Sequence, residues 1–88
     1  MTVIWSARAL SDMADIFAYV AAQSDEAASR IADRIMAAGG NLARFPQIGR
    51  PSRLAGRREL VVDQYVLLYR LRRDNVQIIA VEHGARRR

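Results

Sequence analysis

The chain has 88 residues, no cysteine, and a net charge of +5 carried by 14 arginines and no lysine. A chain of this length forms one domain, and without cysteine it has neither a disulfide framework nor a thiolate metal site. No segment reaches the roughly 18 consecutive apolar residues of a membrane span, and the N-terminus lacks the pattern of a signal peptide. We therefore expect a single cytoplasmic domain over residues 1–88.

The positive charge is concentrated in the C-terminal half of the chain. Residues 1–45 hold four arginines against five acidic residues, a net charge of −1, whereas residues 46–88 hold ten arginines against four acidic residues, a net charge of +6. This half can steer an acidic partner toward the protein. Arginine suits bidentate contacts with carboxylates or phosphates, although a genome-wide preference for arginine over lysine would give the same composition.

Two amphipathic helices follow a short apolar run at residues 3–5. Ser6 is placed to cap a helix over residues 7–22, and Ser24 is placed to cap a second helix. Gly39 and Gly40 within the second helix indicate close packing against a neighbouring element. The short link between the helices predicts an antiparallel hairpin. The predicted buried stripes are Leu10, Met13, Phe17 and Val20 in the first helix and Ile31, Ile35, Ala38, Leu42 and Phe45 in the second.

The second half of the chain reads as three strands. Pro46 ends the second helix, and a loop rich in proline, glycine and arginine follows it. The strand-like runs cover residues 57–62, 65–71 and 76–83, and the connections between them have the length of hairpin turns. The expected order is β-α-α-β-β-β. This order is an α+β fold in which a helical hairpin packs on one face of a small antiparallel sheet.

The two short turns also predict which side chains share a face of the sheet. They place Leu60 opposite Leu67 and Arg70 opposite Gln77. Because successive side chains of a strand point to opposite faces, these pairs assign all the other residues of the three strands to a face. The face expected under the helices contains Arg58, Leu60, Val62, Tyr65, Leu67, Tyr69, Leu71, Val76, Ile78, Ala80 and Glu82. The other face contains Arg57, Glu59, Val61, Val66, Leu68, Arg70, Gln77, Ile79, Val81 and His83.

The second of these faces is the candidate working surface, because no predicted element covers it. A strip of aliphatic side chains rimmed by arginine and glutamate is typical of a protein-binding site. An ordinary solvated sheet face is the alternative. The residues that we expect to bind a protein partner are Arg57, Glu59, Val61, Val66, Leu68, Arg70, Ile79 and Val81.

A catalytic site receives less support. Cutting RNA without a metal needs a base, an acid and cations around one phosphate, and His83 with Arg86 is the best available pair. Arg70 faces Gln77, six residues before His83, which separates Arg70 from the imidazole by roughly 20 Å. No catalytic, metal-binding or cofactor-binding motif is present, so we expect no metal and no cofactor. Phosphate binding by the arginines of the loop and the tail remains open.

Four segments carry a resemblance to a known family: "IWS", "FPQIGRPSR", "RRELVVDQYVLLYRL" and "VQIIAVEHGARR". In this order they resemble the RelE/ParE superfamily of bacterial type II toxins, and the match spans nearly the whole chain. The resemblance implies the β-α-α-β-β-β arrangement. It also implies a co-expressed antitoxin whose C-terminal segment wraps the toxin and neutralises it.

The superfamily acts on two different targets. RelE-like members cleave messenger RNA in the ribosome, and several have a catalytic arginine at the position of Val66, whereas ParE-like members poison DNA gyrase. With Val66 there, no terminal tyrosine and an "HGAR" segment that resembles ParE, we expect a gyrase-directed toxin in a hetero-oligomer with its antitoxin. The expected target contacts are His83, Arg86, Arg87 and Arg88. The alternatives are a ribosome-dependent nuclease that uses His83 and Arg86, and a non-toxic relative that only binds an antitoxin.

Overall fold

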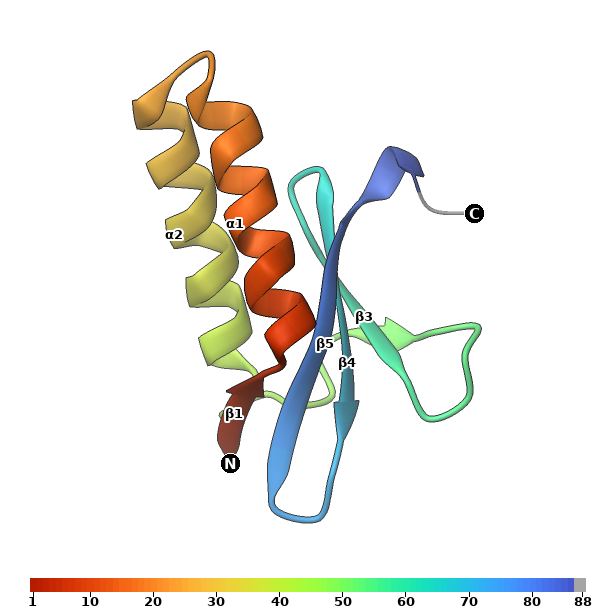
Figure 1. Ribbon diagram of the computed structural model, residues 1–88. Coiled ribbons are helices and arrows are strands. Elements are labelled where there is room, and N and C mark those ends of the chain that lie inside the picture. Colours follow the sequence, from red (N-terminus) through yellow and green to blue (C-terminus); the bar gives the residue numbers. More distant parts are fainter. Residues whose placement is uncertain (87–88) are drawn as a thin grey trace.

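The computed structural model describes residues 1–86, with the backbone alone at Arg86, and its helices form the expected hairpin (Figure 1). Helix α1 (Ala7–Ala21) and helix α2 (Asp25–Asn41) lie side by side. Both predicted caps are confirmed, because Ser6 Oγ accepts a hydrogen bond from the Ala9 N–H at 3.0 Å and Ser24 Oγ accepts one from the Ala27 N–H at 3.1 Å. Within residues 1–86, neither helix is long and apolar enough to span a lipid bilayer.

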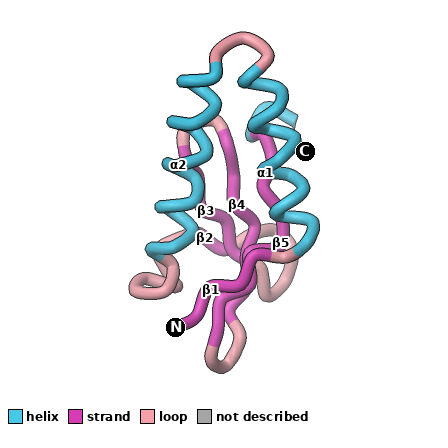
Figure 2. The backbone as a smooth tube through the Cα atoms, turned by 60° about the vertical axis from the view of Figure 1, so that its left-hand side comes forward, coloured by secondary structure: helices cyan, strands magenta, loops and turns pink. Residues whose placement is uncertain are grey.

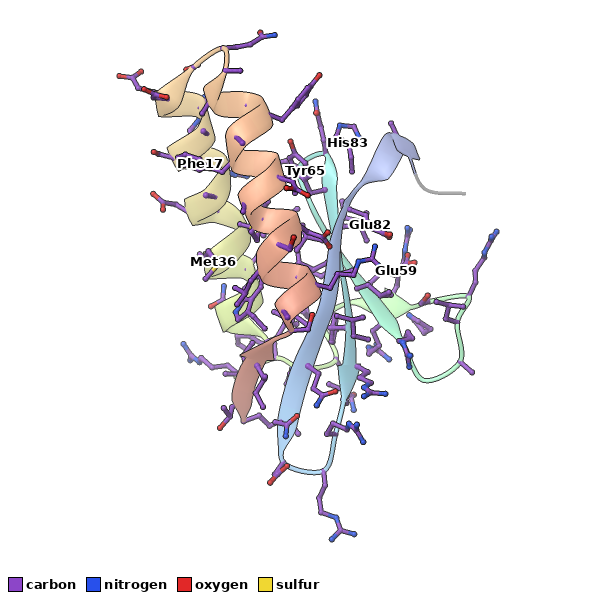
Figure 3. All side chains as sticks on the ribbon, in the orientation of Figure 1. Phe17, Met36, Glu59, Tyr65, Glu82 and His83 are labelled. Atoms are coloured by element: carbon purple, nitrogen blue, oxygen red, sulfur yellow. The ribbon has the colours of Figure 1, made fainter. Side chains whose placement is uncertain are left out.

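The buried side of α1 differs from the predicted stripe. Met13 is buried, but Leu10 and Phe17 are exposed, and Figure 3 labels Phe17 on the hairpin. The side that faces the sheet is centred on Ala9 and Met13, with Ile16 partly buried beside them. Alanine at position 9 lets the helix approach the sheet closely, and hydrophobicity alone does not distinguish this side from the neighbouring one. In α2 the stripe is right through Leu42 and wrong at Phe45, which lies exposed after the helix.

The sheet has five strands in the order β1-β5-β4-β3-β2 and is mixed, not wholly antiparallel. The strands are β1 (Thr2–Trp5), β2 (Arg50–Pro51), β3 (Arg58–Val62), β4 (Tyr65–Leu71) and β5 (Asn75–His83). Strand β1 pairs in parallel with β5, because the chain leaves β1 through the helices and returns to its side as the last strand. Figure 2 shows β1 beside β5, with the rest of the sheet between and behind the two helices. The two-residue strand β2 is too short for periodicity to reveal.

The predicted register is confirmed between β3 and β4, where Leu60 pairs with Leu67. Between β4 and β5 it holds only as far as Ile78. Arg70 faces Gln77 as expected, but a β-bulge follows, and Leu68 faces Ala80. The bulge sets two residues of β5 against one of β4, so every later residue of β5 changes face. The assignment of the last four residues was therefore wrong: Ala80 and Glu82 lie on the uncovered face, and Val81 and His83 lie on the helix side.

The core lies between the helical hairpin and the sheet. Its largest fully buried side chains are Ile35, Leu42, Leu67, Tyr69, Val76 and Ile78. The close packing predicted for the helical glycines is confirmed at Gly39, where a Cβ atom would overlap the Trp5 ring and the Ile78 side chain. It is wrong at Gly40, which has open space around it. Trp5 and Gly39 thus fix α2 against the edge of the sheet.

Candidate functional site

The sheet face that points away from the helices is the first candidate site, and we call it the open face. By strand register it consists of Ile4, Arg50, Arg57, Glu59, Val61, Val66, Leu68, Arg70, Gln77, Ala80 and Glu82. In Figure 1 the loop between β2 and β3 and the C-terminal 3₁₀ turn (Gly84–Arg86) project toward this side. No helix of the described chain crosses it.

The aliphatic strip predicted on the open face is less accessible than expected. Val61 is 54% exposed, but Val66 is 6% exposed and Leu68 is 8% exposed. Gly84 lies over Val66, since a Cβ on this glycine would stand 3.9 Å from the valine Cγ2 atom. Val81 is 3% exposed and packs in the core, because the bulge turns it toward α1. The accessible apolar residues of the open face are therefore Val61 and Ile4, with Ile79 half-buried at the bulge.

A buried carboxylate lies at the centre of the open face. Glu59 is among the buried residues, and its Oε1 atom lies 3.3 Å from Arg50 Nε on the neighbouring strand. The sequence did not predict the pairing of Glu59 with Arg50, because it did not predict β2. A buried carboxylate is costly without a partner, so Arg50 and Glu59 together hold β2 to β3.

Arginine side chains gather around Gln77 on the same face. The Gln77 Oε1 atom accepts hydrogen bonds from Arg70 Nε at 2.8 Å and from Arg72 Nε at 3.4 Å. Loss of hydration and the positive charges of Arg72 and Arg57 lower the pKa of the Arg70 guanidinium from its usual value. Three guanidinium groups are thus held near one another, and this region attracts carboxylates or phosphates.

His83 lies at the opposite end of β4 and β5 and on the other side of the sheet. It faces Tyr65, whose ring it meets edge-on with the centroids 5.3 Å apart, and Nδ1 accepts a hydrogen bond from the Ala85 N–H at 3.1 Å. Arg70 is five residues from Tyr65 along β4, or roughly 16 Å. The imidazole and the arginine cluster therefore do not meet around one phosphate. Figure 3 shows Tyr65 and His83 beside α1, with Glu59 away from the helices.

The tail residues are only partly described. Gly84, Ala85 and the backbone of Arg86 form the 3₁₀ turn, which is tied to the β3–β4 turn by a hydrogen bond from the Gly84 N–H to the Gln64 carbonyl oxygen at 2.7 Å. The Arg86 side chain, Arg87 and Arg88 lie outside the described residues. Their expected contacts with a target stay predictions.

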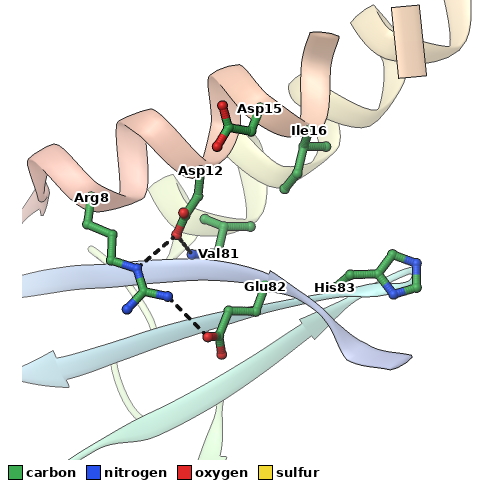
Figure 4. A pocket seen from close by; sticks show the side chains of 7 residues that line it. All are labelled: Arg8, Asp12, Asp15, Ile16, Val81, Glu82 and His83. Atoms are coloured by element: carbon green, nitrogen blue, oxygen red, sulfur yellow. Dashed lines mark hydrogen bonds and ion pairs between the residues drawn. The ribbon is translucent and has the colours of Figure 1, made fainter. Parts of the chain in front are cut away.

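Sequence reasoning missed a second site, a cavity between α1 and the end of β5 (Figure 4). It has a volume of about 250 Å³. Arg8 bridges two of its carboxylates, with Nε 3.5 Å from Asp12 Oδ2 and Nη2 3.2 Å from Glu82 Oε2. Asp12 Oδ2 also accepts a hydrogen bond from the Val81 N–H at 2.9 Å. The spacing of Arg8, Asp12 and Asp15 along one side of α1 was the available signal. The bulge brings His83 to this side, and Glu82 joins the site through its contact with Arg8.

The two sites differ in their proton-transfer groups, because the cavity brings His83 to Asp12, Asp15 and Glu82, whereas the open face has no histidine. The open face carries cations and a carboxylate, while the chain's single histidine lies on the other side of the sheet. Within residues 1–86, no three histidine, aspartate or glutamate side chains are grouped so that they could hold a metal ion.

The fold is shared with solved proteins of bacterial toxin–antitoxin systems. A chain of the chromosomal ParDE toxin–antitoxin system from P. aeruginosa superposes with a TM-score of 0.83 at 24% identity, over 94% of this chain and 95% of that chain. A chain of the RelBE2 toxin–antitoxin complex from Mycobacterium tuberculosis superposes with a TM-score of 0.65 at 25% identity, over 93% and 95% of the two chains.

Sequence comparison gives the family. The family model for the ParE toxin of the type II toxin-antitoxin system parDE matches residues 3–88. Toxin RelE2 of Caulobacter vibrioides is 37% identical over 84 residues, which cover 96% of each chain. The chain therefore belongs to the ParE toxin family of type II toxin–antitoxin systems, and the resemblance drawn from its motifs is confirmed.

Proposed function

We propose that this ParE-family toxin acts in the bacterial cytoplasm by inhibiting DNA gyrase and that a cognate antitoxin neutralises it. The observation that carries the choice of target is the separation of His83 from the arginine cluster, on opposite faces and at opposite ends of the sheet. A nuclease needs its acid, base and phosphate-binding cations around one group. An inhibitor of another protein needs only a complementary surface.

The open face is the proposed antitoxin site, and its arginines and the exposed Val61 are the proposed contacts. Arg57 and Arg70 would pair with carboxylates of the antitoxin, and the exposed Val61 would supply an apolar contact. Such charge pairs mainly raise the rate of association, while a desolvated apolar contact slows dissociation. The buried Val66, Leu68 and Glu59 would support this surface from below.

The proposed gyrase contact is the C-terminal end, formed by His83, Arg86, Arg87 and Arg88. Its support is the concentration of arginine at the end of the chain. A chain that lacks residues 86–88 should lose gyrase inhibition and keep its antitoxin affinity. Equal loss of both activities would contradict the division of the two surfaces.

A ribosome-dependent messenger RNA nuclease is the second candidate. Toxin RelE2, a relative 37% identical, carries the RelE name, and the cluster of Arg57, Arg70 and Arg72 could hold a phosphate. A non-toxic relative that only binds an antitoxin is the third. Induced expression in bacteria separates it from both toxins, because such a protein would leave growth unchanged.

The deciding experiment runs a gyrase supercoiling assay and a ribosome-programmed messenger RNA cleavage assay on one purified preparation. We expect gyrase inhibition that added antitoxin reverses, and intact messenger RNA. Cut messenger RNA, with cutting lost in His83→Ala, would replace the gyrase proposal with the nuclease. Heat-denatured protein and protein with excess antitoxin are the controls.

A further inference from the structure

A groove runs between α1 and the end of the sheet that carries His83. The cavity of about 250 Å³ described above shares Asp15, Ile16 and His83 with a second cavity of about 410 Å³. The two cavities adjoin on the helix side, and we call the pair the α1–β5 groove. Its lining is Arg8, Asp12, Asp15, Ile16, Tyr19, Val20, Ile31, Gln64, Tyr65, Val81, Glu82 and His83.

The floor of the groove is apolar. Ile16 and Val20 come from α1 and Ile31 from α2, while Tyr65 and Val81 come from the sheet. Val81 and Tyr65 are buried, and the three helical side chains are partly buried. A recess of this size with an apolar floor fits a few side chains of another polypeptide.

The rim of the groove is acidic, in contrast to the chain as a whole. Three carboxylates line it, from Asp12, Asp15 and Glu82, against the single guanidinium of Arg8. Three negative charges and one positive charge leave a formal charge of −2, whereas the chain carries +5. The groove therefore repels the phosphates and acidic side chains that the arginine cluster attracts.

The three carboxylates have different roles. Asp12 is occupied by the Val81 N–H and by Arg8, and Arg8 also holds Glu82. Asp15 is exposed and, among residues 1–86, makes no hydrogen bond or ion pair. Beside it, the Nδ1 atom of His83 accepts from Ala85, so the neutral ring carries its proton on Nε2. Asp15 is thus the carboxylate left to bind a cation.

We propose that the α1–β5 groove binds an apolar segment of a protein partner that carries a basic side chain, and that this side chain pairs with Asp15. The proposal rests on the proposed function, because it takes the antitoxin as that partner. The antitoxin would then present acidic residues to Arg57 and Arg70 on one side of the sheet and a basic residue to Asp15 on the other. Two surfaces of opposite charge would fix its orientation and exclude antitoxins with only one of the two signs.

The test measures, by isothermal titration calorimetry, the affinity of the intact chain for the antitoxin encoded by the adjacent open reading frame. Asp15→Arg reverses the charge in the groove. Asp33→Arg, at an exposed aspartate of α2 that does not line the groove, makes the same change in net charge and is the matched control. We expect at least a tenfold loss of affinity for Asp15→Arg and less than a twofold loss for Asp33→Arg. Both positions are exposed, so thermal unfolding should match that of the unaltered chain.

A charge exchange identifies the basic residue. Each lysine and arginine of the antitoxin is changed to glutamate in turn, and one of these variants should bind the Asp15→Arg chain within threefold of the original affinity. Equal affinities for Asp15→Arg and Asp33→Arg would overturn the groove proposal and leave the proposed function intact. If the unaltered chain did not bind the antitoxin, both the proposed partnership and the proposal that the antitoxin occupies the α1–β5 groove would be overturned. Self-association of the unaltered chain that Asp15→Arg abolishes, seen by sedimentation, would also overturn it, with a second copy as the occupant.

Discussion

The two halves of β5 are held in place by different kinds of contact. From Asn75 to Ile78 the strand pairs on one side with β1, and Gly39 of α2 packs closely on Ile78. Beyond the bulge no strand among residues 1–86 covers that edge, and polar side chains of the N-terminal region contact it instead. The Ser6 hydroxyl donates to the Ile79 carbonyl oxygen at 2.8 Å, and Asp12 accepts from the Val81 N–H. One inserted residue separates a half whose outer edge pairs with β1 from a half whose outer edge is held by side-chain hydrogen bonds. Only the second half borders the groove.

Substitution of Gly39 should have the largest effect, because it disturbs the close packing of α2 on Ile78 in the first half of β5. Gly39→Ala places a methyl group into the Trp5 ring and Ile78, and we expect a loss of about 2 kcal/mol or more in the free energy of unfolding. Gly40→Ala meets nothing within 4 Å, and as a helix-interior change it should stabilise by about 0.5–1 kcal/mol. Urea unfolding measures both. Similar values for the two variants would contradict the close approach of α2.

Removal of the Asp12 carboxylate should have an intermediate effect, because it breaks a hydrogen bond to the second half of β5. Asp12→Ala leaves the Val81 N–H without its acceptor and Arg8 without one of its two partners, and we expect a loss of about 1–2 kcal/mol. Asp15→Ala, one turn further along α1, should change the free energy by less than about 0.5 kcal/mol. Hydrogen exchange at the Val81 amide gives a local measurement. An unchanged exchange rate in Asp12→Ala would refute the polar anchoring of this half.

The ion pair between α2 and the β3–β4 turn should have the smallest effect. Arg34 meets Asp63 with two short contacts, from Nε to Oδ2 at 2.7 Å and from Nη2 to Oδ1 at 2.9 Å. Both side chains are largely in solvent, so Arg34→Gln should lower the urea midpoint only slightly, and less at high salt. Arg30→Gln, an exposed arginine of the same helix, is the control. A loss of stability as large as that of Asp12→Ala would show that the turn depends on this pair as β5 depends on Asp12.

Most of the local structure was accessible from the sequence, because local rules determine it. Serine caps, turn lengths and alternation give the hairpin, the three long strands and the β3–β4 register. The bulge was not accessible, since nothing in the alternation of residues 76–83 distinguishes a regular strand from one with an extra residue. It depends on the contacts of Ser6 and Asp12, which lie 73 and 69 residues away from their partners.

In the candidate site, too, local rules predicted some features, and features that depend on distant contacts were missed. Arg70 was placed on the open face correctly, because its side of β4 follows from the turn, but Arg50 was missed together with β2. The burial of Glu59 was missed, since it needs the pairing of Arg50 across a strand of two residues. The α1–β5 groove was missed because the bulge, and not the sequence order, brings His83 beside Asp15.

The parallel pairing of the first strand with the last one has a consequence for synthesis. Thr2–Trp5 can find its neighbour only after Asn75–Ile78 has been made, and α1 gains its hydrogen bonds to Ile79 and Val81 later still. Contacts this distant along the chain are slow to form. The first strand therefore stays unpaired while residues 6–74 are synthesised, and the sheet cannot be completed before Asn75–Ile78 has been made.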